Sequence, residues 1–151
     1  MRKALPLVLL VLMACTAFAQ PASEQDAPGD FVAGLKSAIT KHMGRPYVWG
    51  SSGLKSFDCS GFIWRVMFEN GILLKRTTAR KFYMTLPAVP DEDRYKFGTI
   101  VFFDNLKHVG IVETPSSFYH AQVSRGTNRS IFNSFWRRRI YGFRAIPVPV
   151  Q

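Results

Sequence analysis

The sequence predicts one compact α+β domain, with N-terminal helices packed on one side of a C-terminal antiparallel sheet of about five strands. The first observation is the hydrophobic pattern, which has a helical period before residue 87 and a β-strand texture after residue 97. The second is the series of short turn signals in the second half, which is typical of strands joined by hairpins. Helices followed by strands, without alternation, indicate the α+β class.

The first predicted helix covers residues 30–43, with Asp30 as its N-cap. The run Gly44-Arg45-Pro46 supplies the signal that ends it. The preceding residues 20–29 are polar and contain proline, which is typical of a flexible linker. A shorter helix is expected from Thr77 to Leu86, capped by one of the two threonines that begin it.

The second predicted helix lies between these two and begins at Cys59. It has one apolar face and a stop signal at Gly71; the face is formed by Phe62, Ile63, Val66 and Met67. A cysteine in the first turn of a helix meets unpaired backbone N–H groups and the positive end of the helix dipole. Both effects favour the thiolate, which is the reactive form. Cys59 is therefore a candidate nucleophile.

The second half of the chain predicts an antiparallel meander, in which each strand pairs with the next along the chain. The expected strands are rich in β-branched and aromatic residues and cover residues 99–103, 108–112, 117–123, 130–135 and 140–148. Polar turns separate them, among them residues 125–128.

Residues 1–19 have the pattern of a secretory signal peptide: a basic start, an apolar core and the small-residue cleavage site Ala17-Phe18-Ala19. The apolar core is too short to span a bilayer as a helix. Alternatively, Leu12-Met13-Ala14-Cys15 resembles a bacterial lipobox, in which Cys15 is lipidated and anchors the protein to the envelope. We therefore expect an extracytoplasmic protein, periplasmic or secreted, that contacts a membrane only if Cys15 carries a lipid.

Cysteine usage supports a role for the thiol. The chain contains two cysteines, and removal of the first 19 of its 151 residues leaves 132 residues with Cys59 as the single thiol. That length suffices for one domain, residues 30–151, with one core. An unpaired thiol in an oxidising compartment is unexpected unless it is buried or has a function.

The charge of the chain favours an anionic partner. Net charge is +10, and loss of Arg2 and Lys3 lowers it to +8. For an exported protein, an anionic envelope surface is a better match than nucleic acid. The run Trp136-Arg137-Arg138-Arg139 fits either a solvated face beside one core tryptophan or a polyanion-binding patch.

Two of the three histidines fall on one predicted hairpin, and the third, His42, is assigned to a cap or the surface without a chemical role. If the hairpin turn is centred on Thr114, His108 lies directly opposite His120 on the same face. Cys59, His108 as base and His120 as orienting group then form a relay suited to acyl transfer. A zinc site is an alternative use of these residues, but their spacing matches no close-pair zinc signature. We expect no metal and no cofactor.

The order of motifs resembles that of NlpC-type cell-wall peptidases, which are papain-like cysteine peptidases of the bacterial envelope. The resemblance covers residues 31–147 and rests on Tyr47-Val48-Trp49-Gly50, Phe57-Asp58-Cys59-Ser60-Gly61, Leu74-Lys75-Arg76-Thr77, Val101-Phe102-Phe103, His108-Val109-Gly110-Ile111 and His120-Ala121. It implies a compact papain-like domain and hydrolysis of peptidoglycan stem peptides, typically between γ-D-glutamate and a diamino acid.

The resemblance also implies roles for individual residues. Cys59 would be the nucleophile, His108 the general base and acid, and His120 the orienting residue. Tyr47 would lie near the oxyanion, while Asp58 and Ser60 would lie near the substrate subsites. Core packing is the alternative for Tyr47, and helix capping is the alternative for Asp58.

The chain departs from the family pattern at positions that line the expected groove, such as Leu74-Lys75-Arg76 in place of Leu-Pro-Arg. These changes leave the catalytic groups in place and bear on substrate preference. The competing readings are a non-catalytic envelope-binding module and a related thiol enzyme, an amidase or acyltransferase, with another substrate. We expect a monomer that acts on stem peptides and does not bind nucleic acid.

Overall fold

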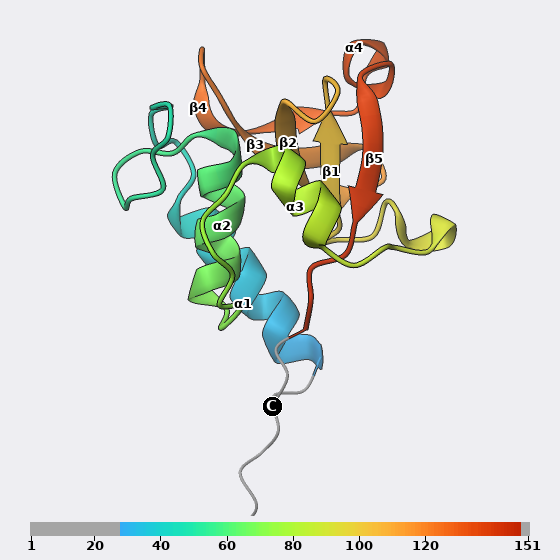
Figure 1. The fold of residues 1–151 in the computed structure, drawn as a ribbon, viewed down its shortest axis with the longest axis horizontal. Helices are drawn as coiled ribbons and strands as arrows, with labels where there is room; N and C mark the ends of the chain where they lie inside the picture. The colour runs from blue at the N-terminus through green and yellow to red at the C-terminus, as the bar shows by residue number, and fades with distance from the viewer. Residues whose placement is uncertain (1–27, 149–151) are drawn as a thin grey trace, which may run out of the picture.

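The computed structural model of the protein describes residues 28–148 (Figure 1). The predicted signal peptide, the lipobox cysteine Cys15 and most of the predicted linker lie outside these residues. The elements, in chain order, are α1 Pro28–Lys41, α2 Cys59–Glu69, α3 Ala79–Thr85, the short 3-10 helix η1 Asp91–Asp93, β1 Ile100–Phe103, β2 His108–Thr114, β3 Ser117–Gln122, β4 Gly126–Ile131, α4 Ser134–Arg137 and β5 Ile140–Arg144.

The fold is the predicted α+β arrangement, with helices packed on a five-stranded antiparallel sheet. The strand order is β4-β3-β2-β1-β5. The predicted meander is correct for the first four strands and wrong for β5, which crosses to the far edge and pairs with β1. Along the chain, helix α4 follows β4 and precedes β5, and it occupies the last residues of the strand that was expected at residues 130–135.

Two local predictions fail for identifiable reasons. Strand β4 begins at Gly126, inside the expected turn at residues 125–128. Gly126 has φ +65°, and a Cβ there would lie 2.0 Å from the carbonyl oxygen of Arg45, so close packing rather than turn formation explains the glycine. Strand β4 ends at Ile131, and Asn133, whose side chain accepts from the Trp136 N–H at 3.1 Å, caps α4 in place of the expected strand.

Helix α1 starts two residues earlier than the predicted domain. Pro28 is its first residue, a position where the missing N–H of proline costs nothing, so Asp30 lies in the first turn rather than at the cap. His42, expected at the surface or as a cap, is buried instead. Its Nε2 lies 2.8 Å from Glu69 Oε1, and its ring packs edge-on against Phe57 at 5.1 Å.

Alternation along the strands divides the sheet side chains into two apolar clusters. One face packs against α1, α2 and α3 through Phe102, Val109, Ile111 and Ala121. The other face carries Val101, Phe103, Val112, Phe118 and Phe143, with Phe132 and Trp136 packed over them. The sheet is therefore buried on both faces, which gives the strands their largely apolar sequences.

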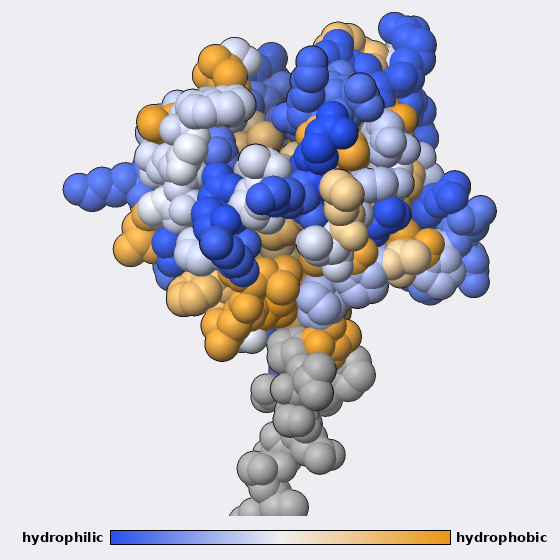
Figure 2. Space-filling view, in the orientation of Figure 1, coloured by the Kyte–Doolittle hydropathy of each residue, from blue (hydrophilic) through white to orange (hydrophobic). Residues whose placement is uncertain are grey.

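The surface is polar over much of the face seen in Figure 2, with an apolar area next to the point where the described chain ends. Within residues 28–148, no helix has both the length and the apolar character needed to cross a membrane.

Candidate active site

Cys59 is held at the first position of α2 by the residue before it. Asp58 has the extended backbone of an N-cap, and its carboxylate accepts from the Gly61 N–H at 2.6 Å. The Cys59 side chain is 7% exposed. Its Sγ lies 3.9 Å from the carbonyl oxygen of Lys107 and within hydrogen-bond reach of the Val109 backbone. The sulfur is therefore placed against the backbone on both sides of His108.

The two strand histidines contact each other directly. His108 Nε2 and His120 Nδ1 are 2.7 Å apart, and the ring centroids are 5.0 Å apart. They are not the directly opposed pair that the sequence predicted, because Gly110 pairs with His120. The turn lies at Pro115 and Ser116 instead of at Thr114, because Thr114 pairs with Ser117, and a bulge at Glu113 shifts the pairing back by one residue. The net difference from the predicted register is two residues, which preserves the face of each side chain. The histidines consequently meet along a diagonal.

Three further residues complete this cluster, and two of them, Asn128 and Ser130, were not predicted from the sequence. His120 Nε2 lies 2.9 Å from Ser130 Oγ, which in turn lies 3.4 Å from Asn128 Oδ1. Trp136 stacks on His108 at 5.6 Å and meets His120 edge-on at 5.0 Å. The alternation of residues 126–131 opposite β3 is the signal that would have found Asn128 and Ser130, but that segment starts in the expected turn.

Burial controls the pKa values of the cluster. It lowers the pKa of His108 to about 4, with Asp104 acting in the opposite direction and Arg139 adding to the decrease. The pKa of His120 is lowered to about 3, by burial first and by the neighbouring His108 second. Both imidazoles are therefore neutral at neutral pH.

The thiol does not have the lowered pKa that its helix position predicted. Burial first, and the Asp58 charge second, raise the pKa of Cys59 to about 11. The backbone amides of Ser60 and Val109 and the charge of Arg76 act in the opposite direction without overcoming the burial. Cys59 is therefore a neutral thiol at neutral pH, as His108 is a neutral imidazole.

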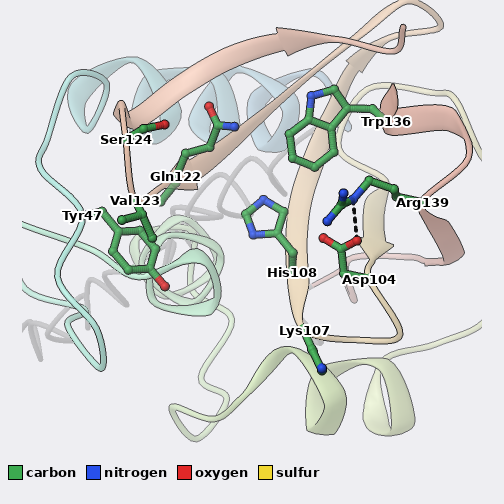
Figure 3. A pocket seen from close by; sticks show the side chains of 10 residues that line it. Tyr47, Asp104, Lys107, His108, Gln122, Val123, Ser124, Trp136 and Arg139 are labelled. Atoms are coloured by element: carbon green, nitrogen blue, oxygen red, sulfur yellow. Dashed lines mark hydrogen bonds and ion pairs between the residues drawn. The ribbon is translucent and has the colours of Figure 1, made fainter. Parts of the chain in front are cut away.

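Two pockets meet at this point and share Tyr47 and Lys107 as lining residues. One, of about 750 Å³, contains Cys59 together with Trp49, Gly50, Asp58, Ser60, Arg76, Thr77, Thr78, Ala79, Arg80 and Leu106. The other, of about 710 Å³, contains His108. Figure 3 shows the His108 imidazole between Tyr47 on one side and Trp136 and Arg139 on the other. The candidate nucleophile and the candidate base thus line two adjoining pockets.

Asp58 and Ser60 line the Cys59 pocket, and both are engaged with Arg76. The Arg76 guanidinium donates to both oxygens of Asp58, at 2.6 and 2.7 Å, and to Ser60 Oγ at 3.0 Å. Asp58 also accepts from Ser60 Oγ at 3.1 Å and from the Gly50 N–H at 2.8 Å. Asp58 is therefore both the cap of α2 and the centre of a network that ties the cysteine helix to the two loops beside it.

The basic run at residues 136–139 has three exposed arginines, two of which also have partners within the protein. Trp136 covers the histidines, as described above. Arg137 donates to the Phe132 carbonyl at 2.7 Å, and Arg139 pairs with Asp104 at 2.5 Å beside the His108 pocket. The exposed Arg138 side chain makes no hydrogen bond or ion pair with other residues of the described segment 28–148.

Metal-ligating side chains do not gather at the site. Among residues 28–148, no group of three or more His, Cys, Asp or Glu side chains is placed to hold a metal ion.

The sequence model of the NlpC/P60 family matches residues 44–145, which include every residue of the cluster. The chain belongs to the NlpC/P60 family. The N-terminal helix of the domain, α1, lies before the matched segment.

Individual members of the NlpC/P60 family show how much of the chain is shared. The probable endopeptidase p60 of Listeria welshimeri is 36% identical over 112 residues, which cover 72% of this chain and 21% of that protein. The probable endopeptidase NlpC of Escherichia coli K12 is 32% identical over 122 residues, covering 76% of this chain and 78% of that protein. The chain spans about a fifth of the length of the Listeria relatives it matches.

Solved structures of the NlpC/P60 family have the same fold. A Staphylococcus aureus protein described as similar to lipoprotein, NLP/P60 family, has a TM-score of 0.68 at 27% identity, covering 84% of this chain and 45% of that one. The peptidoglycan hydrolase RipB of Mycobacterium tuberculosis has a TM-score of 0.67 at 20% identity, covering 81% of this chain and 67% of that one. The second likeness concerns the fold alone.

Proposed function

We propose that this protein is a cysteine endopeptidase that hydrolyses peptidoglycan stem peptides, at the bond between γ-D-glutamate and a diamino acid. The observation that carries the proposal is the position of Cys59 Sγ against the backbone flanking His108, whose imidazole bonds to His120. A nucleophile, a base and an orienting group are the parts needed for acyl transfer. The names of two relatives, the probable endopeptidase NlpC and the probable peptidoglycan endopeptidase LytE, support the substrate class.

The first step transfers a proton from the Cys59 thiol to His108 as the sulfur attacks the carbonyl carbon of the scissile amide. Both groups are neutral before substrate binds, so the thiolate forms as the reaction proceeds. The imidazolium then gives the proton to the leaving amine, the C–N bond breaks, and a thioester to Cys59 remains. Water, deprotonated by His108, attacks the thioester and regenerates the thiol.

The oxyanion of each tetrahedral intermediate has two candidate donors. The Cys59 N–H is at the first position of α2, where backbone N–H groups have no partner within the helix. Tyr47 lines both pockets, and burial first, then the charges of Cys59 and Asp58, raises its pKa to about 12. Its hydroxyl therefore keeps its proton and can donate to an oxyanion.

The two pockets suggest a direction for the substrate. His108 must reach the leaving nitrogen, so the pocket around His108 would receive the diamino acid side of the bond. The pocket around Cys59, with Asp58 and Ser60 on its wall, would receive the γ-D-glutamyl side. Because Asp58 and Ser60 already bond to Arg76, they would contact substrate as parts of a preformed network.

The location of the protein follows from the same proposal. A stem-peptide hydrolase acts outside the cytoplasm, as the predicted signal at residues 1–19 implies, or is attached to the envelope through Cys15. The basic surface would favour an anionic envelope component. Mass spectrometry of the mature N-terminus distinguishes the two cases: Gln20 indicates cleavage, and an acylated Cys15 indicates a lipid anchor.

The decisive experiment digests purified sacculi with the wild type, with Cys59→Ala and with Asp91→Ala, and identifies the products by mass spectrometry. The Asp91 side chain is exposed, lines neither pocket and is not part of the basic surface, so its variant controls for handling of the protein. We expect cleavage products from the wild type and Asp91→Ala only. Activity in Cys59→Ala would refute the mechanism, and wall binding without any product would identify a binding module instead.

A further inference from the structure

The hydrogen-bond chain that starts at His108 continues past His120 into strand β4. Cα pairing places Asn128 opposite His120 and Ser130 opposite Phe118, so Asn128 and Ser130 share the face of both histidines. The successive contacts are His108 Nε2 to His120 Nδ1 at 2.7 Å, His120 Nε2 to Ser130 Oγ at 2.9 Å, and Ser130 Oγ to Asn128 Oδ1 at 3.4 Å. His120 is fully buried, and Asn128 and Ser130 are half-buried.

The hydrogen bonds in this series can donate in either of two directions, and only one direction leaves His108 able to act as a base. If protons point toward His108, then His120 donates from Nδ1, and His108 accepts at Nε2 and carries its own proton on Nδ1. In the opposite direction, His108 donates from Nε2 and keeps Nδ1 free of a proton. Since Nε2 is occupied by His120, Nδ1 is the nitrogen left to accept the thiol proton.

The Asn128 amide, at the far end of this series of hydrogen bonds, determines the direction in which the bonds donate. The Asn128 amide nitrogen donates to the Gly126 carbonyl oxygen at 2.8 Å and to Gln122 Oε1 at 3.0 Å. A backbone carbonyl can only accept, so the contact with Gly126 identifies the amide nitrogen and turns Oδ1 toward Ser130. Oδ1 is an obligatory acceptor as well, so the hydroxyl proton of Ser130 points to Asn128.

Each bond then fixes the next one back along the chain. With its proton directed at Asn128, Ser130 Oγ accepts from His120 Nε2–H. His120 Nδ1 is consequently unprotonated and accepts from His108 Nε2–H. We propose that Asn128 and Ser130 are positioning residues that hold His108 in the Nε2–H tautomer, with Nδ1 free to act as the base.

The effect of these two residues on catalysis rests on the proposed function. The protonation pattern of the two histidines is a property of the free protein and does not depend on that function. Asn128 and Ser130 act only through His120, so they position the base without contacting substrate. Removal of the Ser130 oxygen takes away the acceptor that lies 2.9 Å from His120 Nε2 and leaves this nitrogen only the contact with the Asn128 side chain, so the reverse direction then competes. A mixture of tautomers lowers the fraction of enzyme in which His108 accepts a proton.

The test compares Ser130→Val with Ser130→Thr. The two variants have the same shape, and both are β-branched as a strand favours, so they differ in the hydroxyl alone. Nitrogen NMR of the full chain, labelled at the histidines, reads the tautomers at neutral pH, because protonated and unprotonated ring nitrogens have well-separated shifts. Steady-state kinetics on muropeptides and thermal unfolding are measured on the same samples.

In the wild type and in Ser130→Thr, we expect protonated Nε2 and unprotonated Nδ1 on both His108 and His120. In Ser130→Val, we expect averaged shifts and a kcat lower by roughly 10–100-fold, with little change in KM. Wild-type tautomers and kcat in Ser130→Val would overturn the inference, as would a protonated His108 Nδ1 in the wild type. If the expected tautomers appear but the wild type cleaves no muropeptide, the positioning stands and the proposed function fails.

Discussion

The guanidinium of Arg76 donates hydrogen bonds to both carboxylate oxygens of Asp58, the residue immediately before Cys59. The Asp58 side chain is 10% exposed and that of Arg76 is 25% exposed, so this is a largely buried ion pair. The same carboxylate caps α2 through the Gly61 N–H and holds the Gly50 loop. The orientation of Cys59 therefore depends on a charge pair that links three segments.

Asp58→Ala is expected to be among the most destabilising single changes in this domain. It leaves the Arg76 charge without its partner and removes the helix cap, at a cost of about 3–5 kcal/mol in the free energy of unfolding. Denaturant titration measures this cost. Asp91→Ala, which removes the exposed ion pair with Arg94, is the control and should cost less than about 1 kcal/mol. Equal effects would show that the Asp58 network contributes no more than a surface pair.

Gly61→Ala should disturb the first turn of the cysteine helix. A Cβ at Gly61 would lie 2.0 Å from the Ser51 carbonyl oxygen, a backbone atom that cannot rotate away. Alanine gains about 1 kcal/mol in helix propensity, but overpacking against backbone outweighs that gain, so we expect a net loss of about 2 kcal/mol and lower activity.

Gly53→Ala provides the matched control, because Gly53 lies in the neighbouring loop and has no atom within 4 Å of the added Cβ. Its unfolding midpoint and activity should stay near those of the wild type. If Gly61→Ala is equally well tolerated, the close approach between α2 and the Ser51 loop does not constrain the site.

The raised pKa of Cys59 predicts an unusual alkylation profile. With a pKa of about 11, the free protein should react slowly with iodoacetamide at neutral pH, and the rate should rise as pH increases through 9 and above. A preformed thiolate–imidazolium pair would instead give a rate that is already high and flat from acidic pH upward. Mass spectrometry of the labelled Cys59 peptide against pH distinguishes the two profiles.

Acid should destabilise the domain through its buried histidines. The pKa of His108 is about 4 in the folded state, below the usual value of 6.5, so between these pH values the unfolded chain binds a proton that the folded protein does not. The contribution of the neutral His108 imidazole to the free energy of unfolding is fully present above pH 6.5 and is lost as pH falls toward 4. This contribution is roughly 3 kcal/mol.

Urea titrations at pH 7.5, 5.5 and 4.5 measure this effect, and the pH dependence of kcat/KM gives a second reading. The acid limb of kcat/KM should lie well below pH 6.5, because the base is already neutral there. In Trp136→Ala, which uncovers both imidazoles, the limb should move toward 6.5. An acid limb at 6.5 in the wild type would contradict the burial of His108.

Much of the domain could be predicted from local pattern. Periodicity and caps placed α2 at Cys59, and hairpin texture gave the antiparallel sheet. The faces of His108 and His120 were predictable because side chains alternate with period two, so that even a two-residue error in register left both on one face. The error arises because the turn lies at residues 115 and 116 and a bulge follows at Glu113, and the turn signal specifies neither its own centre nor the bulge.

The sequence by itself determined the class of fold, the helix entrance that carries the cysteine and the common face of the two histidines, because each depends on near neighbours along the chain. The tertiary structure decided the rest. The crossing of β5 to the far edge, the burial that raises the pKa of Cys59, the ion pair of Asp58 with Arg76 and the contacts of Ser130 and Asn128 with the histidines join residues distant in the chain. Desolvation and hydrogen-bond direction arise only when such segments pack together.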